Sequence, residues 1–235
     1  MRFSVDPAVF EILPRLRIAA ILARGLDNAS PRPDLEQRLL EAATAAASDF
    51  VEADFPSHPA IVPWRQAYQA FGAKPSKFRS SIESLLRSAA ASRIRGINPL
   101  VDIYNAVSLR HRLPCGGEDL AAIEGDFGLF RAVGGEPFVP LGGVENEPAL
   151  PGELIYRDDL GAVCRCLNWR EAERTKLTAT TRGAILVIEA LGESDEALMA
   201  AARDLAATVH LELGGEARLG LLSCDRAAVD LSAAA

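Results

Sequence analysis

One stretch constrains the fold of this chain more than any other: residues 98–126, with the sequence NPLVDIYNAVSLRHRLPCGGEDLAAIEGD. Asn98 precedes a proline, and a residue in that position avoids the helical region, so the preceding helix is expected to stop there. Apolar residues then recur over residues 100–109 with a spacing that fits a helix better than a strand. Asp102 and Asn105 lie three residues apart, so they share one face of this helix.

The same stretch continues into the sequence LPCGGED at residues 113–119. Pro114 and the glycine pair Gly116-Gly117 predict a sharp turn, with Glu118 directly behind it. A polar helix face that leads into a glycine turn predicts the wall of a pocket. The alternative is a connector between a helix and a strand, in which the Asn and Asp side chains bond only to the nearby backbone.

The rest of the chain predicts helices first, then strands, then one closing helix and strand. Helical spacing favours helices that begin near Asp34, at residue 61 and near Ser76, with Asp34 and Ser76 as N-caps, and another over residues 196–210. Short apolar runs predict strands over residues 16–22, 127–133, 138–141, 154–156, 162–167, 184–191 and 216–223. No long linker divides these elements, so residues 1–235 are expected to form a single α/β (α+β) domain in which helices flank a mixed β-sheet core.

A basic segment surrounds the predicted helix start at Ser76. Lys74 and Lys77 flank this start and Arg79 falls in the first turn, where positive charge opposes the helix dipole. The chain has a net charge of −7, but residues 74–95 carry +5, so the remainder carries −12. Free helix N–H groups and cations together favour a bound phosphate. The alternative is a solvated basic helix end.

Bulk composition narrows the class of protein. The net negative charge argues against a general cationic coat for nucleic acid, although it permits a local basic patch. No apolar run approaches the roughly 18 residues that span a membrane, and the N-terminus has no secretory pattern. A cytoplasmic protein with reduced thiols and no membrane contact is therefore expected. Cys164 and Cys166 lack the spacing of a zinc site, so we expect core residues, no metal and no cofactor.

Several catalytic motifs are absent from the sequence. It contains no G-x-S-x-G nucleophile elbow, no G-x-x-x-x-G-K-[ST] loop and no H-E-x-x-H helix. Of the three histidines, only His111 lies in the stretch at residues 98–126. A serine or cysteine triad is therefore not expected.

Five segments together resemble a known family. They are RIAAILARGLDN at 17–28, KPSKFRSSIESLLR at 74–87, the stretch at 98–126, GEPFVPLG at 135–142 and CRCLNWREAERTKLT at 164–178. They resemble the B3/B4 domain of the phenylalanyl-tRNA synthetase beta subunit, here in a freestanding form. In the synthetase this domain hydrolyses tyrosine that has been wrongly attached to phenylalanine tRNA. The resemblance implies a B3/B4-like fold and an aminoacyl-tRNA deacylase, with aminoacylated tRNA as partner and its amino acid as the small ligand.

The resemblance also assigns site residues. Asn105 corresponds to the asparagine of the family's VVDVTN-like motif, which lines the editing pocket. Gly116 stands where the family has the histidine of a PLHAFD-like motif. Glu171 is the nearest match to the family's pocket glutamate. This chain therefore lacks the editing histidine.

The expected roles follow from the chemistry of each group. The N–H groups of Gly116 and Gly117 would stabilise an oxyanion, and Glu118 or Glu171 would hold water or the α-ammonium group, with a surface salt bridge as the alternative. The expected substrate-binding residues are Asn168, Trp169, Arg170 and Arg165, together with Asn105, and the expected phosphate-binding residues are Lys74, Lys77 and Arg79. The glycine pair and residues 168–171 should line one hollow, with the basic helix start at its mouth. Two alternatives remain, a non-catalytic module that binds tRNA or an amino acid and an enzyme on a small substrate unrelated to tRNA.

Overall fold

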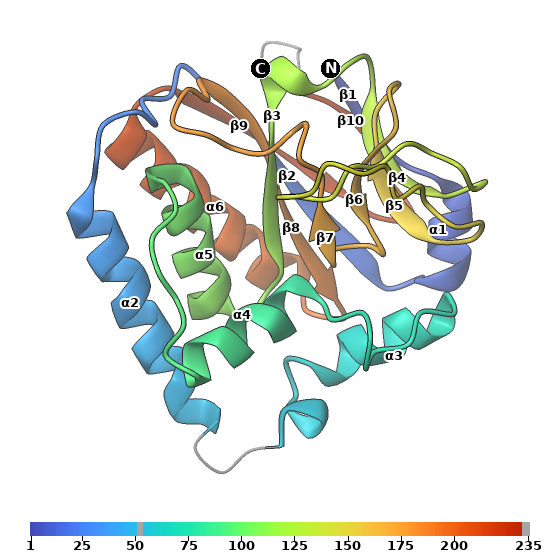
Figure 1. The fold of residues 1–235 in the computed structure, drawn as a ribbon, viewed down its shortest axis with the longest axis horizontal. Helices are drawn as coiled ribbons and strands as arrows, with labels where there is room; N and C mark the ends of the chain where they lie inside the picture. The colour runs from blue at the N-terminus through green and yellow to red at the C-terminus, as the bar shows by residue number, and fades with distance from the viewer. Residues whose placement is uncertain (51–53, 232–235) are drawn as a thin grey trace.

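The computed structural model describes residues 1–50 and 54–231 (Figure 1). In this part of the chain the strands form two sheets, one six-stranded with the order β10-β1-β4-β5-β6-β7 and one four-stranded with the order β3-β8-β2-β9. Helices pack against the four-stranded sheet and below both sheets (Figure 1). The expected mixed β-sheet core with flanking helices is thus confirmed.

The four-stranded sheet is antiparallel throughout. It consists of β3 (Cys115–Asp119), β8 (Gly183–Leu191), β2 (Leu16–Arg24) and β9 (Glu216–Leu222). The central strands β2 and β8 pair along nine residues, and both are largely apolar because each of their faces is covered. The predicted strands at residues 16–22, 184–191 and 216–223 are confirmed.

The six-stranded sheet is mixed. Its strands are β10 (Ala228–Asp230), β1 (Arg2–Val5), β4 (Phe127–Arg131), β5 (Leu154–Arg157), β6 (Ala162–Arg165) and β7 (Arg170–Glu171), and only the pairing of β1 with β4 is parallel. The strand predicted at residues 138–141 is wrong, because this segment forms only an isolated bridge between Pro140 and Ala172. Pro137 and Pro140 lack the N–H group that a sheet ladder needs.

Six α-helices complete the described part of the fold. They are α1 (Pro7–Ile12), α2 (Pro33–Ala47), α3 (Val62–Ala70), α4 (Ser81–Ala90), α5 (Pro99–His111) and α6 (Asp195–Leu213), with short 3-10 turns at Ser48–Phe50, Phe55–Ser57 and Leu120–Ala122. Helices α5 and α6 cover one face of the four-stranded sheet, and α2 lies outside α5 (Figure 1). A second apolar layer, which includes Trp64 and Tyr68 of α3, fills the space between the two sheets. Successive residues of β2 therefore alternate between the two layers.

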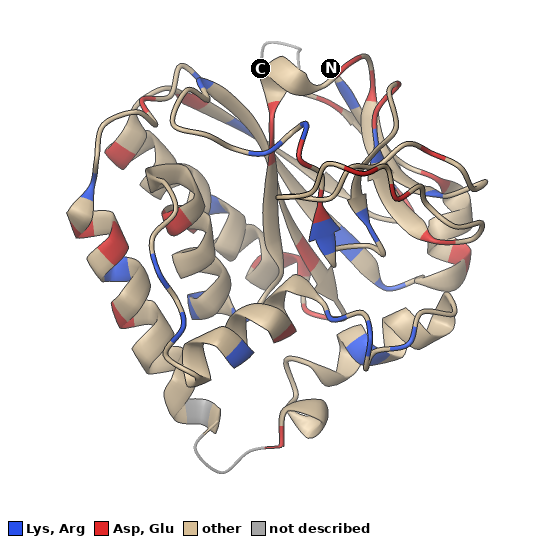
Figure 2. Ribbon diagram, in the orientation of Figure 1, with Lys and Arg blue, Asp and Glu red and all other residues tan. Residues whose placement is uncertain are grey.

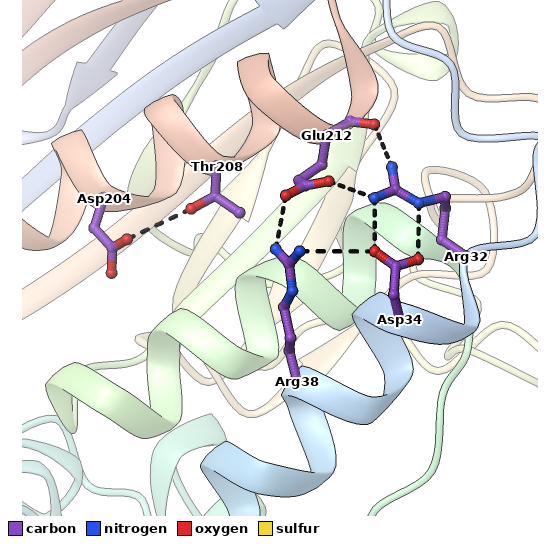
Figure 3. A network of polar contacts seen from close by, with 6 residues as sticks. All are labelled: Arg32, Asp34, Arg38, Asp204, Thr208 and Glu212. Atoms are coloured by element: carbon purple, nitrogen blue, oxygen red, sulfur yellow. Dashed lines mark hydrogen bonds and ion pairs between the residues drawn. The ribbon is translucent and has the colours of Figure 1, made fainter.

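An ion network joins the N-terminal end of α2 to the C-terminal end of α6 (Figure 3). Arg32 donates to the Asp34 carboxylate over 2.9 and 2.8 Å and to the backbone carbonyl of Glu212 over 2.6 Å. Arg38 meets the Glu212 carboxylate at 2.6 Å. The expectation that Asp34 is the N-cap is wrong: Arg32 occupies that position, and Asp34 lies in the first turn, where its charge suits the helix dipole.

The helix predicted to start at Ser76 instead starts at Ser81. Ser80 is the N-cap, and its hydroxyl accepts a hydrogen bond from the Glu83 N–H over 3.3 Å. The sequence Ser80-Ser81-Ile82-Glu83 has the S-x-x-E spacing of a capping box, which explains why the helix begins there. Lys74, Lys77 and Arg79 consequently lie in the turn before α4 rather than on its first turn.

The sharp turn predicted at Gly116-Gly117 is also wrong. Both glycines lie inside strand β3, opposite Val187 and Leu186 of β8. The chain reverses earlier, at Arg112, which ends α5 with a left-handed φ of 58°. The glycines are required for close approach instead: a Cβ atom at Gly117 would lie 2.5 Å from the Leu186 side chain.

Candidate functional site

A hollow of about 370 Å³ opens between the N-terminal half of α5, the edge strand β3 and the strand β7. We call it the α5–β3 hollow. Its lining is mostly apolar and consists of Ile97, Asn98, Val101, Tyr104, Gly117, Leu141, Glu171, Lys176, Leu177, Thr178 and Ala179. This volume lies near the lower end of the roughly 300–1,000 Å³ of ligand pockets, so the hollow suits a ligand the size of an amino acid.

The α5 wall is fixed by two asparagines. Asn98 caps α5 by accepting from the Val101 N–H over 3.1 Å, and its amide donates to the Leu177 carbonyl over 3.2 Å. Asn28 is fully buried and donates to the Thr178 carbonyl over 2.8 Å. These bonds hold the loop at residues 177–178 against α5. Val101 and Tyr104 reach the hollow because residues three apart share one helix face.

The β3 wall presents Gly117. Hydrogen bonds alternate sides along an antiparallel strand, and the Asp119 N–H points away from β8, where it donates to the Thr175 carbonyl over 2.8 Å. The Gly117 N–H, two residues earlier, is directed to that same side, whereas the alternation directs the Gly116 N–H at β8. Only one of the two amides expected to stabilise an oxyanion is therefore oriented for a ligand.

Glu118 and Glu171 form a carboxyl pair at the wall of the hollow. Glu118 is 4% exposed and its carboxyl group lies beside that of Glu171, which is half-buried and lines the hollow. Burial, reinforced by the negative charge of Glu171, raises the pKa of Glu118 well above its ordinary value. Burial also raises the pKa of Glu171, while its hydrogen bond with Glu118 opposes that shift.

Asn168 lies deeper, between the two sheets, and not on the lining of the hollow. Its side-chain oxygen accepts from the Tyr68 hydroxyl over 3.0 Å and from the Ser81 N–H over 3.3 Å, and its amide donates to Glu189. Tyr156 donates to the same glutamate over 2.6 Å. Burial raises the pKa of Glu189 to about 7. Asn168 thus connects α3, α4 and β8 rather than facing a ligand in the hollow.

Three other residues expected to bind substrate have partners elsewhere. Arg165 is 7% exposed and donates to the Glu153 carboxylate over 2.9 and 2.6 Å. The Trp169 ring meets the Phe78 ring edge-on, with centroids 4.7 Å apart. The Arg170 guanidinium lies over the Trp169 ring at 5.8 Å. Arg165 is therefore a buried structural residue, whereas Trp169 and Arg170 are half-buried and do not line the hollow.

The basic turn before α4 lies next to Trp169. Lys77 sits 5.1 Å from the centroid of Phe78, whose ring contacts Trp169. Figure 2 shows basic residues along the segment that joins α3 to α4. The buried Glu83 carboxylate offsets part of the positive charge of this region. Arg65 donates to this carboxylate over 2.7 and 3.0 Å, and the more exposed Arg79 lies 3.8 Å from it.

The glycine pair and residues 168–171 were expected to line one hollow, but only part of this set lies there. Gly117 and Glu171 share the hollow, and Glu118 touches Glu171 behind its wall. Asn105 is half-buried on α5 and is not among the lining residues. Sequence reasoning gave no role to Tyr104 of the lining, although its three-residue spacing from Val101 was the signal that could have placed both on one wall.

The described residues offer no group of three or more His, Cys, Asp or Glu side chains arranged to hold a metal ion. No helix in the same part of the chain is long and apolar enough to cross a membrane. Burial raises the pKa of the Cys115 thiol, so it is protonated and poorly nucleophilic.

The described structure combines a two-sheet α/β fold with a small hollow and a carboxyl pair at its wall. The family model described as "B3/4 domain" matches residues 63–209, and the chain belongs to this family.

Among solved structures, the fold matches an N-terminal fragment of the phenylalanyl-tRNA synthetase beta-subunit from Pyrococcus horikoshii. The two are 16% identical, with a TM-score of 0.48, over 92% of this chain and 50% of that chain. This chain thus spans about half the length of the matched fragment. A comparison with curated proteins finds no match.

Proposed function

We propose that the protein is a trans-acting editing enzyme that hydrolyses the ester bond between a wrongly attached amino acid and its tRNA. The observation that carries this proposal is the Glu171 carboxyl group on the wall of an otherwise largely apolar hollow of about 370 Å³. The hollow would take the amino acid, and the carboxyl group would face its ester. Membership of the B3/4 family, together with the resemblance to the synthetase editing domain, supports this choice of substrate.

The reaction needs little from the protein beyond positioning, because an aminoacyl ester is already activated. The Glu171 carboxylate takes a proton from the attacking water, a general-base contribution of typically 10²–10⁴-fold. The Gly117 N–H, directed away from β8, stabilises the developing oxyanion. Apolar lining residues, among them Val101 and Leu177, hold the amino-acid side chain.

The tRNA contacts the basic turn before α4. Lys74 and Lys77 are exposed there, beside the half-buried Phe78 and Trp169. Aromatic rings next to cations suit the unpaired bases and phosphates at the end of a tRNA. The rest of the chain is acidic, so it repels the tRNA elsewhere and favours this one approach.

A deacylation assay tests the proposal. A panel of mischarged aminoacyl-tRNAs is incubated with the wild-type protein and with Glu171→Gln, and Glu196→Gln serves as an exposed, isosteric control on α6. We expect faster ester loss than in buffer for at least one amino acid, a loss of about 10²-fold or more in Glu171→Gln, and no change in the control. Ester loss at the buffer rate across the panel would contradict the proposal.

A non-catalytic module for tRNA or an amino acid is the second candidate. The observation that favours it is Gly116, which has no side chain where the related synthetases have a histidine. This candidate predicts saturable binding of aminoacyl-tRNA without ester loss. In both cases Lys74→Glu with Lys77→Glu weakens tRNA binding and makes its salt dependence shallower, whereas an enzyme for a small substrate unrelated to tRNA is unaffected.

A further inference from the structure

The two glutamates at the wall of the hollow differ in their access to it. Glu118 projects from β3 into the space between the sheets and is 4% exposed. Glu171 comes from β7 and lines the hollow. The Glu171 Oε1 atom lies over Gly116, at 3.1 Å from the place where a Cβ atom would stand. The missing side chain at residue 116 therefore makes room for the Glu171 carboxyl group beside Glu118.

Both carboxyl groups contain an atom without a partner. Among the described residues, the buried Oε2 atoms of Glu118 and Glu171 have no hydrogen-bond partner. Two ionised carboxylates have only acceptor atoms, so they cannot satisfy each other. One proton placed between the groups supplies the missing donor and removes one of the two like charges. A buried oxygen without a partner is destabilising, so the protonated arrangement is favoured.

We propose that Glu118 and Glu171 hold a single proton between them, with Glu118 as the proton donor that positions the Glu171 carboxylate as the general base of the α5–β3 hollow. This inference rests on the proposed hydrolytic function for its reaction step, but the shared proton itself does not depend on that function.

The surroundings determine which group keeps the proton. The groups that interact electrostatically with the pair include Tyr104 from α5, Tyr156 from β5, Cys164 from β6, Glu189 from β8, and Arg174 and Thr175 from the segment after β7. Arg174, the cation of this set, also pairs with Asp158 at 2.7 Å. Burial raises the pKa of both acids, but Glu118 is only 4% exposed whereas Glu171 is half-buried and lines the hollow, so the proton is favoured on Glu118 and the charge on Glu171.

The reaction step follows from this assignment. The water oxygen attacks the ester carbonyl carbon while the Glu171 carboxylate accepts one water proton. The tetrahedral intermediate then collapses: the bond from the carbonyl carbon to the ribose oxygen breaks, and Glu171 returns the proton to that oxygen. The products are the free amino acid and a tRNA with a free hydroxyl group. Glu118 keeps its own proton throughout and orients Glu171.

Infrared spectroscopy tests the shared proton without any substrate. We expect the difference spectrum between wild-type protein and Glu118→Gln at pH 8 to contain the carbonyl stretch of one protonated carboxylic acid. Glu171→Gln should retain such a band at a shifted frequency, because the Glu118 proton is then donated to an amide oxygen instead of a carboxylate; an unshifted band would overturn the sharing. Glu189 is present in all three proteins, so its band cancels. The absence of a difference band would overturn the inference.

Kinetics tests the positioning role. Glu118→Leu removes the donor, so kcat should fall about 10-fold or more with KM nearly unchanged, and the acid limb of the pH–rate profile should move to higher pH because Glu171 loses a bond that stabilises its charged form. Glu118→Gln restores a donor and should recover most of kcat. Equal kcat values and pH profiles in both variants and the wild type would overturn the positioning role.

The infrared and kinetic experiments test the shared proton and the proposed hydrolytic function separately. A difference band without hydrolysis of any aminoacyl-tRNA supports the shared proton and contradicts the proposed function alone. Hydrolysis that depends on Glu171 without a difference band supports the function and overturns the shared proton. If Glu118→Leu fails to fold, Glu118→Ala, which also lacks the donor, takes its place in the kinetic comparison with Glu118→Gln, and the infrared comparison is unaffected.

Discussion

Two adjacent glycines on β3 should respond in opposite ways to the same substitution. Gly116 and Gly117 are neighbours in one extended strand, so alanine is compatible with the backbone at both positions. Their missing side chains point to opposite faces of the sheet. Gly116 faces the Glu171 carboxyl group, and Gly117 faces the apolar layer under α5. The substitutions Gly116→Ala and Gly117→Ala therefore separate stability from function.

Gly117→Ala should destabilise the fold. Its Cβ atom would lie 2.5 Å from Leu186 Cδ2 and 3.2 Å from Leu177 Cδ1, whereas carbon atoms prefer about 3.5–4.0 Å. Leu186 is fully buried and has little room to move. Overpacking of this kind costs about 1–3 kcal/mol, and replacing glycine returns about 0.4–1 kcal/mol through the unfolded state. We expect a net loss of about 1–2 kcal/mol.

Gly116→Ala should leave the stability within about 0.5 kcal/mol of the wild type. Its Cβ atom meets the Glu171 Oε1 atom at 3.1 Å and the Val187 side chain at an ordinary 3.9 Å. The Glu171 carboxyl group ends a flexible side chain and can shift, and the entropy gain from replacing glycine offsets that cost. The shift displaces the carboxylate that we propose as the general base, however, so we expect the deacylation rate to fall about 10-fold or more.

Urea unfolding followed by circular dichroism measures the two stabilities, and the deacylation assay measures the two rates. We expect Gly117→Ala to unfold at a lower urea concentration than Gly116→Ala, and Gly116→Ala to give the lower deacylation rate relative to its folded fraction. A Gly116→Ala protein that is the less stable of the two would refute the assignment of the faces.

Three further predictions concern the polar residues of the fold. Glu83→Ala should cost about 3 kcal/mol in urea unfolding, because Glu83 is fully buried and its loss leaves the Arg65 guanidinium without its carboxylate; an unchanged midpoint would contradict this. Burial raises the pKa of Glu189 to about 7 from an ordinary 4.5, so the folded state holds this proton more tightly than the unfolded state. The free energy of unfolding should therefore decline as the pH rises from about 4.5 to 7. Urea titrations at several pH values should show a flatter dependence of this free energy on pH in Glu189→Gln. Glu212→Gln should weaken the network between α2 and α6 (Figure 3) and lower the unfolding free energy by about 1 kcal/mol at low salt, with a smaller difference at high salt.

The elements that the sequence predicted correctly are those whose signal is local. The apolar runs at residues 16–22 and 184–191 are long enough to mark buried strands, and the spacing over residues 100–109 marks α5. The capping box at Ser80 was equally local and could have corrected the start of α4.

The errors arise where a residue serves a distant partner. Gly116 and Gly117 have the composition of a turn, but their requirement for glycine comes from Glu171 and Leu186, which lie more than 50 positions further along the chain. The contact between Glu118 and Glu171 has the same origin, since no periodicity relates two residues on different sheets. The short strands β1, β7 and β10 have two to four residues each and exist only through pairing with other strands.

The position of the hollow between two terminal strands affects how a bound molecule enters and leaves it. Its walls include β3 and β7, and each of these is the terminal strand of a different sheet. Terminal strands separate from their neighbours at a lower free energy than central ones, so either wall can detach briefly while β2 and β8 stay paired. A molecule enclosed there would leave through such a partial opening. Its residence time would therefore depend on how often β3 or β7 separates from its sheet, and not on the stability of the whole domain.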